Sequence, residues 1–173
     1  MKKPGFILLC LLMLLACSNP KKQMTHQVEE QEKNIEQGFS KEKADQLLVS
    51  YDTYIEKYPK DTTSRLYMAK GVELSILNND PQDALKFIDL FQKNFPDDPK
   101  AGLMQFKKAV VYDLLMHDPL RAVAEYDIFI QHFPDDPMRK EAQNAIWLIQ
   151  DPQAFMDAIT ERTDSTSQVG KNQ

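Results

Sequence analysis

Beyond residue 40, apolar residues recur every three or four positions, which is the spacing of one face of an amphipathic helix. The clearest stripe covers residues 44–58 and is followed by Pro59. A proline pushes the residue before it out of the α region, so a helix should stop there. Phe95-Pro96 and Phe133-Pro134 repeat the same aromatic–proline stop. The pattern therefore predicts an all-α chain.

Aspartate–proline pairs mark the expected helix starts. Aspartate is a preferred N-cap residue and proline is preferred at the first helical position, so each pair should begin a helix. The pairs are Asp80-Pro81, Asp98-Pro99, Asp118-Pro119, Asp136-Pro137 and Asp151-Pro152. Starts and stops together predict seven helices, over residues 41–58, 63–78, 81–95, 99–117, 119–133, 137–149 and 152–160. A weaker helix, charged nearly all round, is expected over 25–37, either frayed or docked on a partner.

The first residues have the pattern of an export signal. Lys2 and Lys3 precede ten uninterrupted apolar residues, 6–15. As a helix this run would be about 15 Å long, half of a hydrocarbon core of roughly 30 Å, so it suits a cleavable signal better than a membrane span. The run ends in Leu14-Leu15-Ala16-Cys17, which resembles the bacterial lipobox.

The lipobox resemblance implies that residues 1–16 are a lipoprotein signal peptide, cleaved before Cys17. Cys17 would then carry a diacylglycerol thioether and an N-acyl chain such as palmitate, and several buried chains make a durable membrane anchor. Ser18 favours the outer membrane by similarity to proteobacterial sorting, and the basic Lys21-Lys22 favours its periplasmic side. The alternative is an ordinary secretory peptide with a chance cysteine. Residues 17–39 would comprise the lipidated cysteine, a short polar tether over 18–23 and the charged helix.

Composition excludes several classes of function. The chain has 173 residues, 42% of them hydrophobic, which is enough for one modest core. The net charge of −5 would become −7 after loss of Lys2 and Lys3, and an acidic chain lacks the basic face that nucleic acid requires. Cys10 would leave with the signal, so the mature chain would keep no free thiol, as suits an oxidising compartment.

A repeat underlies the proline pattern. Pro59 and Pro96 are 37 residues apart, and Pro96 and Pro134 are 38 apart. When residues 70–99 are aligned with 108–137, thirteen of thirty positions are identical. Two helices in each fixed period predict a helical solenoid, because one helix pair cannot bury its apolar face alone.

This repeat resembles the tetratricopeptide (TPR) repeat. The small positions of the family's second helix fall on Ala84 and Ala122, and those of its first helix fall on Gly71 and Ala109. Its terminal proline follows an aromatic residue, a pattern most similar to TPR lipoproteins of bacterial envelopes, including BamD-type components of the barrel assembly machinery. The resemblance implies a right-handed solenoid of antiparallel helix pairs over residues 40–160. The period exceeds the family's 34, and Tyr54, Phe91 and Phe129 fill a position that is usually small.

The family's ligand groove, carried over position by position, implies a set of binding residues on the first helix of each repeat. The set is Arg65, Met68, Val72, Ser75, Ile76, Leu103, Phe106, Val110, Asp113 and Leu114. Because the set is so apolar, either it forms a hydrophobic peptide trough, or part of it packs on the N-terminal helix. Lys70 and Lys108 hold equivalent places and could bind a carboxylate; the alternative is that both are simply solvated.

Catalytic and metal-binding patterns are missing from the sequence. Asp97-Asp98 and Asp135-Asp136 precede prolines, where helix capping explains them. The three histidines, His26, His117 and His132, lack ligand spacing, and no nucleophile elbow or phosphate-binding loop occurs. We therefore expect neither an enzyme nor a bound metal or cofactor, apart from the acyl lipid. The polar residues 161–173 are expected to form a disordered tail.

Together these features predict a lipid-anchored envelope adaptor whose partners are the membrane and an envelope protein or peptide client. Barrel assembly and envelope maintenance are the roles that the resemblance implies. A pilotin-like escort of a secretin or motility component is the alternative. A carbohydrate-capture lipoprotein is disfavoured because Trp147 is the single tryptophan.

Overall fold

The computed structural model describes residues 19–169, with side chains described to residue 160. The predicted signal peptide, Cys17 and residues 170–173 lie outside the described part. Residues 19–169 are helical with connecting turns and contain no strand, which confirms the all-α class. The chain divides into two compact units, residues 1–64 and 65–173, which we describe separately.

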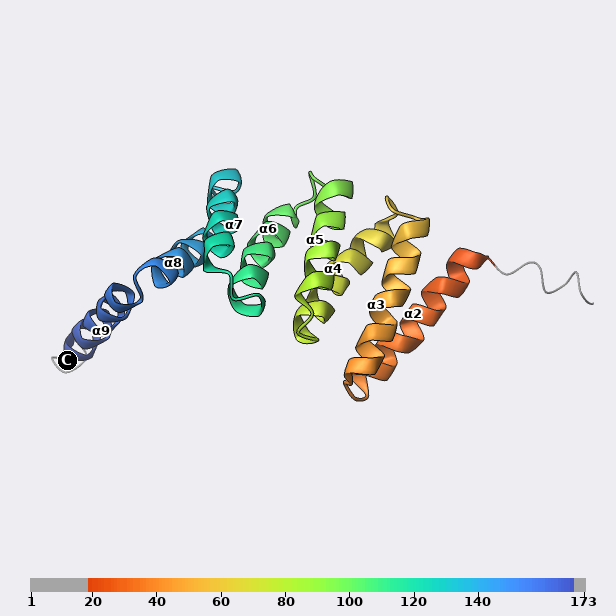
Figure 1. The fold of residues 1–173 in the computed structure, drawn as a ribbon, viewed down its shortest axis with the longest axis horizontal. Coiled ribbons are helices and arrows are strands. Elements are labelled where there is room, and N and C mark those ends of the chain that lie inside the picture. The colour runs from red at the N-terminus through yellow and green to blue at the C-terminus, as the bar shows by residue number, and fades with distance from the viewer. Residues whose placement is uncertain (1–18, 170–173) are drawn as a thin grey trace, which may run out of the picture. The chain divides into compact units, whose positions relative to one another are not determined.

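Unit 1, as far as it is described, is a helix hairpin. Helix α2 (Pro20–Glu36) and helix α3 (Lys41–Lys57) lie side by side and are joined by a short turn (Figure 1). Val28 of α2 is fully buried, as are Leu47 and Leu48 of α3. The helix expected over 25–37 is therefore docked within the chain itself.

Helix α2 also begins earlier than expected. The side chain of Asn19 accepts a hydrogen bond from the backbone N–H of Lys21 at 3.0 Å, and Pro20 occupies the first helical position. Most of the polar tether expected over 18–23 is therefore helical. The sequence pattern gave only a weak signal for α2 because few apolar residues line the face that this helix buries. Packing on α3, rather than intrinsic helix propensity, stabilises α2.

Unit 2 contains the remaining helices. They are α4 (Thr62–Leu77, which begins in unit 1), α5 (Pro81–Asn94), α6 (Ala101–Val110), the π-helix η2 (Val111–Leu115), α7 (Pro119–His132), α8 (Arg139–Gln150) and α9 (Pro152–Val169). Consecutive helices α5 to α9 pack on one another, with η2 contacting α5 and α7. A core cluster of Ala109, Ala122, Tyr126, Phe129 and Ala142 joins α6, α7 and α8.

Local geometry in unit 2 recurs 38 residues apart. The rings of Phe91 and Phe95 lie 5.8 Å apart, and so do those of Phe129 and Phe133. Asn79 and His117, in the turns after α4 and η2, both adopt the left-handed backbone conformation, with φ of 55° and 52°. The turn conformation and the spacing of the aromatic rings therefore recur with the sequence repeat, although the ring planes meet at 52° in the first pair and at 28° in the second.

Three of the five aspartate–proline pairs begin helices as expected. Asp80, Asp118 and Asp151 each accept the backbone N–H of the residue three positions on, with the proline at the first helical position of α5, α7 and α9. The expectation is wrong for Asp98 and Asp136. Helices α6 and α8 begin three residues after these aspartates, at Ala101 and Arg139.

Two further boundaries differ from expectation. The helix expected over 99–117 becomes a π-helix after Val110, where the N–H of Met116 bonds to the carbonyl of Val111. Helix α9 runs to Val169, well into the segment expected to be a disordered tail. No proline or glycine occurs between residues 153 and 169, so no residue there breaks the helix.

Candidate functional site

Three aspartates recur at the same place in the chain, two residues after each stop proline. One oxygen of each carboxylate accepts the backbone N–H of the residue two positions on. The pairs are Asp61 with Thr63 (3.0 Å), Asp98 with Lys100 (2.8 Å) and Asp136 with Met138 (2.8 Å). These short turns open the chain reversal before the next helix. They explain why Asp98 does not cap α6.

The other carboxylate oxygen of Asp61 and of Asp98 forms an ion pair. In unit 1 the Lys21 ammonium lies 2.6 Å from Asp61 Oδ2, and in unit 2 Arg65 Nη1 lies 2.9 Å from Asp98 Oδ2. Both basic residues belong to the first turn of the helix that begins the pair, α2 or α4. Each ion pair therefore ties the start of a hairpin to the loop that follows it. The spacing of proline and aspartate was visible in the sequence, but the basic partner was not.

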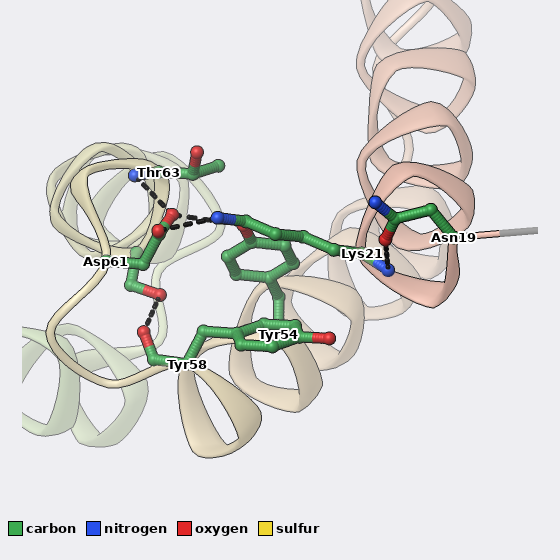
Figure 2. Close-up of polar contacts among 7 residues, drawn as sticks. Asn19, Lys21, Tyr54, Tyr58, Asp61 and Thr63 are labelled. Atoms are coloured by element: carbon green, nitrogen blue, oxygen red, sulfur yellow. Dashed lines mark hydrogen bonds and ion pairs between the residues drawn. The ribbon is translucent and has the colours of Figure 1, made fainter.

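Figure 2 shows the polar cluster around Asp61. The phenol of Tyr54 donates a hydrogen bond to Asp61 Oδ1 at 3.1 Å, in addition to the contacts that Asp61 makes with Lys21 and Thr63. The Lys21 hydrogen bond and, more weakly, those from Thr63 and Tyr54 lower the pKa of Asp61 to about 2. The same hydrogen bond raises the pKa of Lys21, and burial raises that of Tyr54. Asp61 thus remains a carboxylate at neutral pH.

A group of lysines surrounds this cluster. The ammonium groups of Lys21 and Lys57 each lie 5.6 Å from the centroid of the Tyr58 ring. Lys22 and Lys60, the sequence neighbours of Lys21 and Asp61, are exposed. We call residues 19–22 and 56–61 the basic end of unit 1. It carries four lysines against Glu56 and Asp61.

The predicted groove residues on α4 are mostly buried. Met68, Val72 and Ser75 are completely covered, Ile76 is half-buried, and Arg65 is held by Asp98. Three of the five residues therefore present no surface to a ligand in this conformation. Met68, Val72 and Ser75 are core residues here because the helices pack closely around them.

The predicted groove residues on α6 and η2 are mostly half-buried, and one of them is exposed. The ring of Phe106 packs edge-on against Tyr126 and Phe129, at 5.6 and 5.5 Å. Leu103 and Val110 are half-buried, while Leu114 is 61% exposed. Asp113 is hydrogen-bonded to the phenol of Tyr126; burial and the Asp113 charge raise the pKa of Tyr126 to about 12. Burial also raises the pKa of Asp113. Only Leu114 of this set is largely open to solvent.

The two equivalent lysines are engaged within the chain. Lys108 lies 3.0 Å from Asp89 Oδ1 and 3.9 Å from Glu125 Oε1. Burial lowers its pKa, but these carboxylates outweigh that effect and the net shift is upward. Lys70 also has a partner within the structure. Neither lysine is an open site for a ligand carboxylate here.

A polar bridge runs beside Lys108 across three helices. Gln92 of α5 donates to Gln105 of α6 at 2.8 Å, and Gln105 donates to the Glu125 carboxylate of α7 at 2.7 Å. Lys107 pairs with Glu73 in addition. Because these buried or half-buried polar groups satisfy one another, the bridge stabilises the packing of α5, α6 and α7 and leaves few donors for a ligand.

Three exposed apolar side chains of unit 2 lie next to the turn between η2 and α7. Leu120 is 85% exposed, Leu114 is 61% exposed, and Met116 lies between them in sequence. We call these three residues the η2–α7 edge. Leu77, at the preceding turn after α4, is 66% exposed, and Figure 1 places both turns on the same side of unit 2. Exposed apolar groups that cluster in this way mark interaction surfaces.

An apolar pocket lies between α8 and α9. It encloses about 200 Å³, and its lining includes Trp147, Phe155 and Ile159. The rings of Trp147 and Phe155 meet edge-on at 5.4 Å. These residues were expected to cap the last helices, and the contact between α8 and α9 agrees with that role. The pocket is too small for most ligand sites, which are usually about 300 Å³ or larger.

Among residues 19–160, whose side chains are described, no three metal-ligating side chains come close enough to hold an ion. Within residues 19–169, no helix combines the length and apolarity needed to cross a bilayer. The described surface includes a basic end on unit 1 and the exposed apolar η2–α7 edge on unit 2. No family model matches the sequence, and comparison with curated proteins finds no match.

Proposed function

We propose that this chain is a lipid-anchored adaptor of the cell envelope, built as a TPR-like right-handed solenoid and facing the periplasm from the outer membrane. The Leu14–Cys17 lipobox pattern supports the anchor. The 38-residue recurrence of aromatic pairs, left-handed turns and aspartate turns supports the repeat class.

The observation that carries the binding role is the η2–α7 edge. Leu114 in η2 and Leu120 in the first turn of α7 flank the turn between these elements, and at 61% and 85% exposure most of their apolar surface is not buried within the chain. An amphipathic segment of a client could cover both leucines together with Met116, whose flexible side chain adapts to varied partners. This edge replaces most of the groove carried over from the TPR family.

A photocrosslinking experiment in cells tests this role. A photoreactive phenylalanine analogue at position 120 should give a discrete crosslink to an envelope protein, and Leu114→Asp should abolish that product. The control position is Gln131, exposed and eleven residues further along α7, about 16 Å away. Equal products from positions 120 and 131, or no loss with Leu114→Asp, would rule out the edge. The product's identity separates barrel assembly from secretin escort.

Metabolic labelling tests the anchor separately. Growth with an alkyne-bearing fatty acid should label the wild-type protein, and Cys17→Ala should remove both the label and the membrane association. A Cys17→Ala protein that still sediments with membranes would contradict the tether.

A further inference from the structure

We propose that the basic end of unit 1 rests on the anionic headgroups of the bilayer that holds the acyl anchor. This inference rests on the proposed lipidation of Cys17. It adds a second, electrostatic contact between the folded domain and the membrane, and it specifies which end of unit 1 faces the lipid.

The first argument is covalent distance. Asn19 caps α2, and only two peptide units separate it from Cys17. Two extended residues span about 7 Å, so a lipidated Cys17 holds the start of α2 at the headgroup level. This is within the Debye length of about 8 Å at physiological ionic strength, so charges there feel the lipid surface.

The second argument is the position of the lysines. Helix α3 returns antiparallel to α2, so its last residues lie beside the anchored start of α2 (Figure 1). The Lys21 ammonium lies 5.6 Å from the centroid of the Tyr58 ring, which shows how close the start of α2 comes to the end of α3. Lys22, Lys57 and Lys60 are exposed at this end, whereas Lys21 is largely neutralised by Asp61.

The third argument is charge segregation. The basic end has a net charge of +2, whereas the rest of residues 19–64 has a net charge of −4. The start of α2 adds the partial positive charge of a helix N-terminus. In an acidic protein, this asymmetry orients unit 1 with its basic end toward an anionic surface and its acidic remainder away. Each lysine near such a surface favours contact by about fivefold.

The experiment uses the lipidated protein, purified from membranes and reconstituted into vesicles. Since Cys10 leaves with the signal and Cys17 is acylated, an introduced cysteine is the single reactive thiol. A fluorophore at Thr62→Cys reports on the basic end, and one at Gly38→Cys reports on the opposite end of the hairpin. Both positions are exposed. Vesicles contain phosphatidylcholine alone or with phosphatidylglycerol, plus a headgroup quencher.

We expect the label at position 62 to be quenched at least twofold more with phosphatidylglycerol than without it. High salt, or Lys57→Glu with Lys60→Glu, should remove the difference. The matched control, Lys33→Glu with Lys41→Glu, reverses two exposed lysines elsewhere in unit 1 and should leave it unchanged. The label at 38 should stay unquenched in both lipids.

Three outcomes separate the possibilities. The inference would be overturned, with the anchor left intact, if quenching at position 62 did not depend on lipid charge. The same would follow if both charge-reversal variants lost the lipid-dependent quenching equally. Failure of the wild-type protein to float with phosphatidylcholine vesicles would instead overturn the proposed anchor, and the inference with it. Lipid-dependent quenching confined to position 62 would support both.

Discussion

The ring of Phe87 on α5 lies directly over the backbone of Gly71 on α4. A Cβ at position 71 would come within 2.8 Å of ring carbons of Phe87, closer than real side-chain contacts allow. Phe87 is fully buried. Gly71 is therefore required for the close approach of the two helices.

Gly71→Ala should accordingly destabilise the protein. Overpacking costs about 1–3 kcal/mol, and the better helix propensity of alanine returns up to about 1 kcal/mol. We expect a net loss of about 1–2 kcal/mol in urea unfolding. Gly38→Ala is the control, because no atom lies within 4 Å of its Cβ position. A Gly71→Ala variant as stable as Gly38→Ala would show that Phe87 can move aside.

Phe91→Ala should remove a central core contact. The side chain is completely buried and packs on Phe95, so truncation should cost about 3–5 kcal/mol of unfolding free energy. Leu120→Ala, at an 85% exposed position, should change stability by no more than about 0.5 kcal/mol. A loss below 1 kcal/mol for Phe91→Ala would contradict the packing described here.

The Lys21–Asp61 ion pair should make stability depend on pH below about 5. The folded-state pKa of Asp61 is about 2, below its ordinary value of 3.8, so its contribution is complete only above about pH 5 and is lost progressively as pH falls through 2. Asp61→Asn should therefore be less stable than wild type at pH 7, and the difference should shrink steadily as pH falls toward 2. Asp45→Asn, in an exposed pair with Lys41, should have little effect at either pH. A constant difference between Asp61→Asn and wild type from pH 7 to 2 would exclude the carboxylate charge as the cause.

His117→Gly should stabilise the turn between η2 and α7. His117 has a φ of 52°, a conformation that glycine adopts without the steric cost of a Cβ. We expect the midpoint of thermal unfolding to rise, with a gain of about 0.5–1 kcal/mol. Asn79→Ala, at the equivalent position, should lower stability. A drop for His117→Gly would mean that the imidazole makes a compensating contact.

Local sequence signals predicted most helix ends correctly. Aromatic–proline stops and three aspartate–proline starts depend on residues adjacent in the chain, and steric exclusion and capping act over a few residues. These helix boundaries could therefore be predicted without a structure. The same holds for the aspartate two residues after each stop proline, although its partner could not be identified.

Tertiary packing decided what those signals left open. Helix α2 is stable because Val28 is buried against α3, although its sequence is charged nearly all round. Asp98 turns to Arg65, 33 residues earlier, rather than capping the helix after it. Met68 and Val72 are core residues rather than groove residues because neighbouring helices close over them.

The sequence alone determined the helical class, the repeat period and the lipobox pattern, since these follow from short-range chemistry. The three-dimensional structure decided which apolar residues remain exposed and which lysines gather beside the start of α2. Burial and charge proximity depend on segments far apart in the chain, and their packing is set by the sum of many weak contacts rather than by one residue's neighbours.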